Sequence, residues 1–174
     1  MITMQQSSLE NQTAIIDMIS SHKPLADILK IVLSDLEYIF KANKVNCSVM
    51  LYEPQTNTLA HTYSNTLSKS FIDAIEPVDV SPYGGSSGTA AFYMQPVVVE
   101  DIELNPICTK YRYIACMYGI RSSWAYPIMT TDQQLLGTLE FYSEHVGRPS
   151  AAQLSIIETY SRLAALAIAN EKLK

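Results

Sequence analysis

The sequence contains few cysteines, a modest share of charged residues and no long hydrophobic run. Its three cysteines, Cys47, Cys108 and Cys116, are an odd number without the spacing of a disulfide framework, so we expect reduced thiols in a cytoplasmic protein. No apolar stretch approaches the roughly 20 residues that a membrane span needs. The first residues also lack the basic start and apolar core of a signal peptide. We therefore expect no membrane span.

Positive charge is scarce as well, because 12 Lys and Arg residues stand against 17 Asp and Glu residues and leave a net charge of −5. Without a basic stripe, neither nucleic acid nor an anionic membrane is expected as the main partner. His22, His61 and His145 stand apart from other metal-ligating residues, so we expect no metal site. No Ser-His-Asp set or pair of carboxylates can be placed, and we expect no catalytic residue.

What the 174 residues do contain is a globular balance, with 48% hydrophobic and 17% charged residues, which suits one domain with a core. Helical periodicity is clear at both ends of the chain. Pro24 is well placed to open one helix, and Ser150 with Gln153 forms the capping box of a long helix that is expected to run to the last residue. Apolar residues recur at intervals of three and four along both helices. In the helix after Pro24 they are Leu25, Ile28, Leu29, Val32, Leu36, Ile39 and Phe40, and in the last helix they are Leu154, Ile157, Tyr160, Leu163, Ala164, Ala167 and Ile168. A third helix, before Pro24, is expected from Leu9, Ile15, Ile16 and Ile19.

Strand patterns lie between these helices. Residues 45–53 and 58–64 predict one hairpin, and residues 122–129 and 135–143 predict a second. A short helix is expected over 68–75, and a short buried strand over 97–99. Hairpins imply antiparallel pairing, and the terminal helices must cover one face of the resulting sheet. The fold class is therefore α+β.

The stretch GGSSGT, residues 84–89, can be interpreted in two ways. Gly84 and Gly85 allow backbone angles that other residues avoid, and Ser86, Ser87 or Thr89 can cap a helix that starts near Gly88. A helix start with free N–H groups is also suited to bind an anion. The motif alone does not separate a capped turn from an anion site.

With its elements in this order, the chain resembles a GAF domain, the small-molecule sensor module of phosphodiesterases, phytochromes and many bacterial signalling proteins. The resemblance covers residues 22–173 and rests on the segments HKPLADILKIVLSDLE, SVMLYEPQTNTLAHTYS, GGSSGTAAFYMQPVVVEDI, YGIRSSWAYPIMTTDQQLLGTLEFYS and SAAQLSIIETYSRLAALAIANEKL. It implies a PAS-like antiparallel sheet of five or six strands, with the N- and C-terminal helices on one face. Short helices and loops would roof a pocket on the other face. We expect an N-terminal helical extension over 1–21 and the GAF domain with its signalling helix over 22–174.

Two chemistries of the family do not match these residues. In the free methionine-R-sulfoxide reductases, which this fold resembles, a cysteine directly precedes the Gly-Thr-Ala-Ala run, whereas this chain has Ser87, whose hydroxyl cannot form a sulfenic acid or a disulfide. The Cys-His pair of bilin-binding GAF domains is replaced by Lys110 and Tyr111, so no covalent cofactor is expected. The Asn43-Lys44 dipeptide, typical of cyclic-nucleotide-binding members, precedes the first strand and is out of place.

Aromatic residues gather where the family has its pocket, and they suit a planar or partly polar ligand. On the strand 122–129, the face with Ser122, Trp124, Tyr126 and Ile128 is our choice for the pocket, although these aromatics are as well suited to fill the core. Glu140 is interpreted as a solvent-facing or Lys-paired carboxylate. The ligand-binding residues we expect are Ser86, Ser87, Thr89, Asp101, Tyr111, Tyr113, Trp124 and Tyr126.

The resemblance implies a non-catalytic sensor that binds a small molecule noncovalently and signals through its terminal helices, which we expect to form a homodimer. Family members of this bacterial type precede diguanylate cyclase, phosphodiesterase or histidine kinase domains, which suggests two-component or cyclic-di-GMP signalling. Two alternatives stay open: a dimerisation module with a collapsed pocket, and a redox enzyme of the methionine sulfoxide reductase type.

Overall fold

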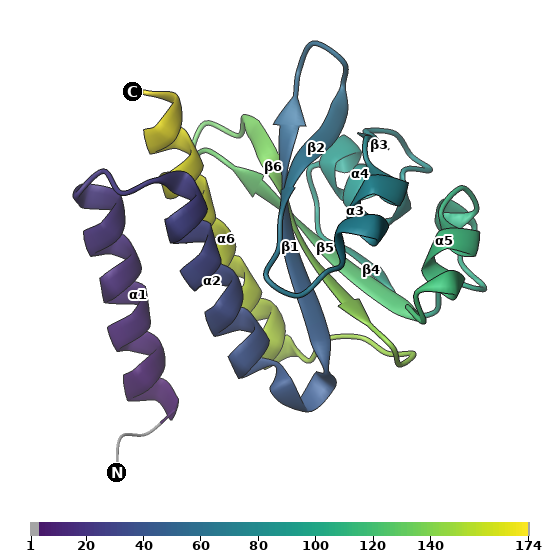
Figure 1. Ribbon diagram of the computed structural model, residues 1–174, viewed down its shortest axis with the longest axis horizontal. Coiled ribbons are helices and arrows are strands. Elements are labelled where there is room, and N and C mark those ends of the chain that lie inside the picture. Colours follow the sequence, from purple (N-terminus) through teal and green to yellow (C-terminus); the bar gives the residue numbers. More distant parts are fainter. Residues whose placement is uncertain (1–3, 174) are drawn as a thin grey trace.

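The computed structural model describes residues 4–173, and the side chains of residues 9–173, as an α+β fold around one six-stranded sheet (Figure 1). The strands lie in the order β3-β2-β1-β6-β5-β4, and every neighbouring pair is antiparallel. This confirms the predicted fold class, and the two predicted hairpins are β1–β2 and β5–β6. The strands are β1 (Val45–Glu53), β2 (Thr58–Tyr63), β3 (Val78–Asp79), β4 (Val97–Val99), β5 (Ser122–Met129) and β6 (Leu135–Ser143).

The helices divide between the two faces of the sheet (Figure 1). The terminal helices α2 and α6 lie together on one face, with α1 packed against both, and the short helices α3, α4 and α5 lie on the other. The helical segments are α1 (Met4–Ser20), α2 (Leu25–Ile39), η1 (Lys41–Asn43), α3 (Lys69–Ile75), α4 (Gly85–Tyr93), η2 (Pro106–Cys108), α5 (Arg112–Met117) and α6 (Ala151–Lys172).

Strand β6 contributes to two separate hydrophobic clusters, one on each face of the sheet. Because successive side chains of a strand point to opposite faces, Leu139 and Phe141 reach the helices α2 and α6, while Tyr142 reaches the side of α3, α4 and α5. Phe40, at the end of α2, meets Phe141 edge-on with ring centroids 5.3 Å apart. One strand therefore touches both layers of helices.

The capping box predicted for the last helix is present. The Ser150 hydroxyl accepts from the Gln153 N–H at 3.2 Å, and the Gln153 side-chain oxygen accepts from the Ser150 N–H at 2.8 Å. Within the helix, Ile157 and Tyr160 are buried against α2 and the sheet. The predicted end of the helix at Lys174 lies outside the described residues, and α6 as described ends at Lys172.

Helix α4 begins earlier than predicted, at Gly85, and none of its hydroxyl groups caps it. Its N-cap residue, Gly84, has no side chain, and the helix lies directly against the backbone of β3. A Cβ atom at Gly84 or Gly88 would stand 2.2 Å from the Asp79 carbonyl oxygen, a distance that no side chain can occupy. The glycines thus serve close packing, and the nearby serines are free for another role.

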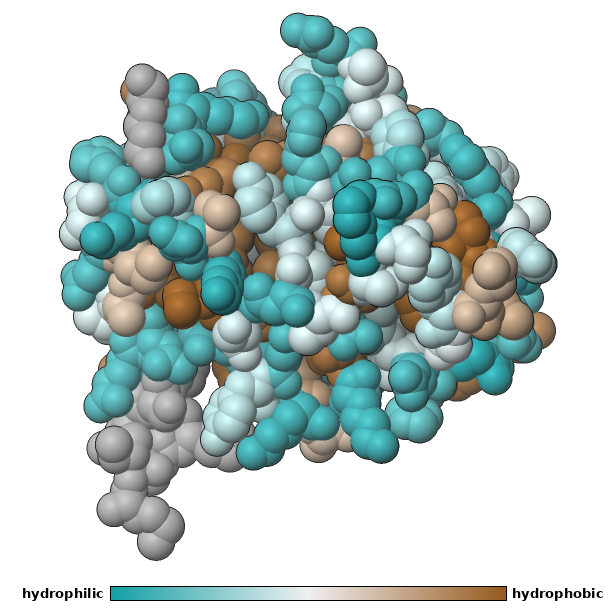
Figure 2. Space-filling model, viewed as in Figure 1, coloured by the Kyte–Doolittle hydropathy of each residue, from teal (hydrophilic) through white to brown (hydrophobic). Residues whose placement is uncertain are grey.

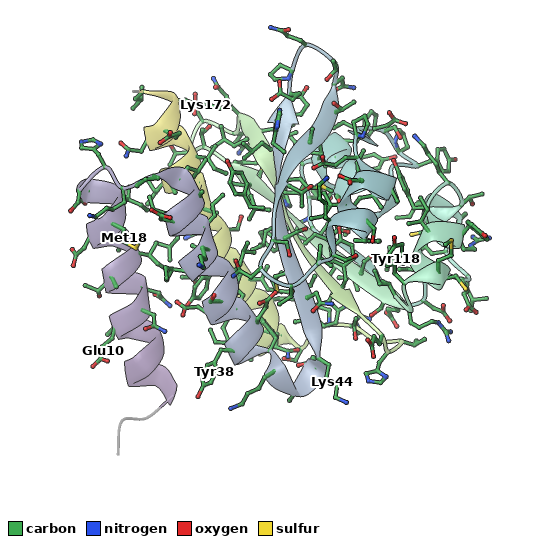
Figure 3. The ribbon with its side chains drawn as sticks, in the orientation of Figure 1. Glu10, Met18, Tyr38, Lys44, Tyr118 and Lys172 are labelled. Carbon is green, nitrogen blue, oxygen red and sulfur yellow. The ribbon has the colours of Figure 1, made fainter. Side chains whose placement is uncertain are left out.

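Hydrophilic residues cover most of the face seen in Figure 2, and apolar residues show mainly in smaller patches, among them one near α5. Tyr118, at the end of α5, is labelled in Figure 3 on the side of the sheet that carries α3. Its ring meets that of Phe71 from α3 with centroids 5.2 Å apart. The aromatic contact joins the two helices on this side.

Candidate ligand-binding site

A hollow of about 50 Å³, partly open to solvent, lies between the sheet and the short helices on the face opposite α2 and α6. This space holds a few water molecules and is smaller than the roughly 300 Å³ at the lower end of sites for small organic molecules. Its walls are mainly apolar, and its polar groups gather where α4 begins. The lining residues are Phe71, Ile75, Val78, Gly84, Gly85, Ser86, Ser87, Ile102, Cys108, Tyr111, Ala115, Ile120, Ser123, Glu140 and Tyr142.

Glu140 of β6 is the acidic group of this hollow, and its side chain is almost completely buried. The Ser86 hydroxyl donates to one carboxylate oxygen, Oε1, and the Ser87 hydroxyl donates to the other, Oε2. The Tyr142 hydroxyl also donates to Oε2, at 2.9 Å. Burial raises the pKa of Glu140 from 4.5 to about 7, although the hydrogen bonds from Ser86 and Tyr142 oppose that rise.

The two interpretations of GGSSGT can now be separated. An anionic group does occupy the start of the α4 helix, but it is the carboxyl group of Glu140. The first turn of a helix favours negative charge, because its N–H groups have no partners within the helix. Ser86 and Ser87 therefore hold an internal carboxylate, and the expectation that they cap α4 is wrong.

Glu140 is also where the sequence interpretation fails most clearly, because the residue was expected at the surface or beside a lysine. Its exposed fraction is 2%, and no ion pair within the described part of the chain includes it. The predicted register was right, since Thr138, Glu140 and Tyr142 do share a face of β6. Helix α4 covers that face. The two adjacent serines and the carboxylate within an apolar strand were the sequence signal that could have indicated the burial of Glu140.

The choice of face on strand β5 is wrong as well. Trp124 belongs to the cluster with α2 and α6, and its indole N–H donates to the Gly147 carbonyl at 3.0 Å. Tyr126 packs against the same cluster, whereas Ser123, from the other face, lines the hollow. Alternation identifies which residues share a face, but both faces of this sheet are covered, so composition could not show which one borders the cavity.

The remaining predicted residues take several positions. Tyr111 lines the hollow together with Ser86 and Ser87. Thr89 is buried on α4, where its hydroxyl donates to the Pro82 carbonyl at 3.2 Å. Asp101 pairs with Arg121 at 3.4 Å and accepts from the Glu103 N–H, so it orders the turn after β4.

The expected aromatic roof is only partly present. Tyr113 is 75% exposed on α5, and Tyr83, Phe92 and Tyr93 are also exposed. Tyr111 is the aromatic residue of this group that reaches the cavity, where Gly85 leaves room for its ring. Its hydroxyl oxygen is buried and has no hydrogen-bond partner of normal geometry within the described residues.

The three thiols are free. Cys47 is buried in the cluster with α2 and α6, Cys116 is exposed on α5, and Cys108 lines the hollow. Burial raises the pKa of Cys108 to about 12, and the nearby Glu140 acts in the same direction. A thiol in this state is protonated near neutral pH and is a poor nucleophile.

A second, more polar cleft of about 150 Å³ adjoins the hollow and is partly open to solvent. The two spaces share Phe71, Ile120 and Tyr142 as a common wall. Asn46, Thr66, Ser68, Ser143 and Glu144 supply polar groups on the outer side of that wall.

Comparison with known proteins places this geometry in a family. A family model described as "GAF domain" matches residues 22–169. A curated relative from Methanosarcina acetivorans, the methyl sulfide methyltransferase-associated sensor, is 28% identical over 158 residues, which are 91% of this chain and 16% of that protein. This chain therefore spans about a sixth of the length of that relative.

Solved structures share the same fold. The GAF domain of a phosphoenolpyruvate-protein phosphotransferase from Coxiella burnetii superimposes with a TM-score of 0.75 at 17% identity, covering 95% of this chain and 94% of that chain. Free methionine-R-sulfoxide reductase from Neisseria meningitidis, in complex with its substrate, gives a TM-score of 0.69 at 16% identity, covering 94% and 86%.

Metal-ligand clusters and membrane-spanning helices are both absent from the described residues. No group of three or more potential metal ligands comes together, and no helix combines the length and apolarity needed to cross a bilayer. The sheet order, the placement of the terminal helices and the roofed hollow agree with the sequence match over 22–169. The chain belongs to the GAF domain family.

Proposed function

We propose that this chain is a non-catalytic regulatory domain that binds a small molecule noncovalently in the hollow beside Glu140. The observation that carries the proposal is the combination, in one enclosed space, of apolar walls and a single cluster of polar groups around a buried carboxylate. Such a combination is typical of sites that recognise small molecules. The curated relative, named as a sensor, supports the same role.

The fold offers a route from the hollow to the terminal helices. On β6, Glu140 and Tyr142 face the hollow, and the intervening Phe141 packs among the side chains of α2 and α6. A ligand that displaces the β6 backbone must also displace Phe141. We propose that this displacement shifts α2 and α6, and that the shift is the output of the domain. The ligand can bias the output only by its differential affinity for the two arrangements.

The output would act on a partner through the same helices. We propose that α1 and α6 contribute to a homodimer in the cytoplasm, where free thiols are stable, and that an effector domain of a signalling protein receives the shift. Leu9 and Ile16 of α1 and Leu166 of α6 are large exposed apolar side chains that would be covered in such a dimer.

Two features favour this function over the alternatives. A cluster of carboxylate and hydroxyl groups in a hollow that is partly open to solvent favours ligand binding over a module whose pocket has collapsed. The protonated state of Cys108, together with a serine at position 87, speaks against thiol-based reduction of methionine sulfoxide, the activity class of one structural neighbour.

Native mass spectrometry of the purified chain tests the proposal. We expect a fraction of the protein to carry a small molecule that is released on denaturation, without a covalent adduct. Phe71→Trp, which fills the hollow, should abolish the bound mass, while the same change at the exposed Phe92 should leave it intact. A bound mass that survives Phe71→Trp would place the ligand elsewhere, and a covalent adduct would refute noncovalent binding.

A further inference from the structure

The hydroxyl groups around Glu140 can be assigned as donors or acceptors from their contacts. Ser86, Ser87 and Tyr142 each own one hydroxyl proton, and each donates it to the ionised Glu140 carboxylate. The Ser86 oxygen also lies 2.7 Å from the Ser123 oxygen. Since the Ser86 proton is already committed, Ser123 must be the donor in that contact. The hydroxyl protons of these four residues are thus in use, whereas the buried Ser48 hydroxyl, opposite Glu140 on β1, has no hydrogen-bond partner of normal geometry among the described residues.

The same assignment shows which acceptors remain. A carboxylate has about four lone-pair positions, and Oε2 already receives two hydroxyl protons while Oε1 receives one. One position remains on Oε1, and the Ser123 oxygen keeps lone pairs that none of these contacts uses. The side chains at the polar end therefore offer acceptors, and a ligand that pairs with them must bring donors.

The charges around the site also favour a ligand that brings hydrogen-bond donors. The basic residues nearest in sequence to the lining segments pair with groups other than Glu140, although the Lys110 ammonium also stands 5.4 Å from the ring centre of Tyr111, which lines the hollow. Lys110 pairs with Asp79, Arg121 pairs with Asp101 and Glu103, and Arg112 donates to the carbonyls of Ile102 and Asn105. The ionised Glu140 is left without a cationic partner among the described residues. A buried carboxylate that has hydrogen bonds but no cationic partner is still costly, and a cation that reaches it would relieve that cost.

Beyond the polar end, the hollow is apolar. Ile75, Val78, Ile102, Ala115 and Ile120 line it, together with the ring of Phe71. A ligand that fills this space must carry a hydrocarbon or aromatic body, because these side chains offer no polar partner. The buried Tyr111 hydroxyl is another polar group on the wall, and it lacks a normal hydrogen bond. It can accept a hydrogen bond from a polar substituent of the ligand or donate one to it.

We propose that the hollow binds a small organic ammonium ion, with its N–H groups on Glu140 Oε1 and Ser123 Oγ and its apolar body among the side chains around Phe71. The inference rests on the proposed function, because it names the ligand class of that same site. It excludes anions, which the Glu140 carboxylate would repel, and it disfavours neutral alcohols, which gain no charge pairing.

The test uses calorimetry to measure how tightly the full chain binds ligands that share one apolar body and differ in their polar head group. 2-Phenylethylammonium, 2-phenylethanol and 3-phenylpropanoate share their aromatic body, and n-butyl and cyclohexylmethyl bodies with the same three head groups extend the set. We expect the ammonium member to bind at least about tenfold more tightly than its alcohol for the body that fits best, and the carboxylate member not to bind.

Glu140→Gln removes the charge and should abolish the preference for ammonium over alcohol. The matched control is Glu158→Gln, because Glu158 is an exposed carboxylate on α6 that pairs with Arg162 far from the hollow. If Glu140→Gln fails to fold, the unmodified chain answers the same question by pH. Ammonium affinity should rise between about pH 5.5 and about pH 7.5, as Glu140 ionises, while alcohol affinity should not rise.

Failure of the inference and failure of the proposed function give different results. If a neutral or anionic member binds as tightly as its ammonium counterpart, or if the mass retained by the purified protein proves to be an anion, the ligand class is wrong and the sensor role stands. If no member binds and no mass is retained, both the ligand class and the proposed function are refuted.

Discussion

The ring of Phe71 meets the ring of Tyr142 edge-on, with centroids 5.4 Å apart and ring planes at 86°. Both residues border the inner hollow and the outer polar cleft, so the pair forms part of the wall between the two spaces. Tyr142 is fixed by its hydrogen bond to Glu140, whereas Phe71 belongs to the short helix α3. Phe71 is therefore the member of the pair that can move aside to admit a ligand.

We expect Phe71→Leu to accelerate ligand association and dissociation together, because a smaller side chain opens the shared wall. Stopped-flow fluorescence with a bound ammonium ligand would measure both rates, and each should rise several-fold. The control is Phe92→Leu, at a phenylalanine that is 46% exposed on α4. Rates that stay unchanged in Phe71→Leu would show that ligands enter by another route.

The stability of the empty domain should depend on Glu140 in a defined direction. Its pKa of about 7 in the folded chain exceeds the ordinary 4.5, so the folded state binds more protons than the unfolded state between these values. The free energy of unfolding should therefore fall as the pH rises from about 4.5 to about 7, and stay low above that. The full effect is on the order of 3 kcal/mol.

Urea unfolding of the unmodified chain and of Glu140→Gln at several pH values would measure this effect. The other titratable groups that face Glu140 are Cys108, Tyr111 and Tyr142, and burial raises the pKa of each, so they stay neutral across this window. The difference between the two proteins should thus grow in favour of Glu140→Gln as the pH rises. A constant difference would mean that Glu140 is ionised, or protonated, at every pH tested.

Gly88→Ala should destabilise the domain and distort the hollow, because the new Cβ would stand 2.2 Å from the Asp79 carbonyl oxygen. We expect a loss of about 3 kcal/mol or more in the free energy of unfolding, since the backbone of β3 or α4 must move. Thermal and urea unfolding would measure it, with the exposed Ser155→Ala on α6 as control. A loss below about 1 kcal/mol would contradict the close approach of α4 to β3.

The three thiols should react with iodoacetamide in a fixed order. Cys116 is exposed and should be alkylated first, while burial raises the pKa of Cys108 and Cys47 and should slow both by at least about a hundredfold. Peptide mapping after timed exposure of the native protein would give the rates. A ligand in the hollow should slow Cys108 further and leave Cys116 unchanged. Fast labelling of Cys108 would contradict its protonated, enclosed state.

The sequence predicted the elements and the layers because their signals are local. Apolar spacing revealed α2 and α6, and the capping box at Ser150 marked the start of the last helix within one turn. The hairpin of residues 122–143 followed from two apolar runs around a polar turn. Each of these patterns depends on neighbours a few residues apart in the chain.

The site could not be predicted in the same way, because its contacts are distant in sequence. Ser86 and Glu140 are separated by 54 positions, and nothing local shows that a helix start will lie over a strand carboxylate. Trp124 illustrates the opposite error, since a large aromatic on a strand was taken as a pocket residue while the helices on the other face required it. Tyr111 lines the hollow, and its role in ligand binding stays a prediction.

The central claim is that occupancy of the hollow is communicated through β6 to the terminal helices. Amide hydrogen exchange of the full chain, with and without a saturating ammonium ligand from the head-group series, tests it most directly. We expect slower exchange in α4 and β6, around Ser86 and Glu140, together with a changed exchange rate in α2 and α6. Protection confined to α4 and β6, with both terminal helices unchanged, would contradict the claim.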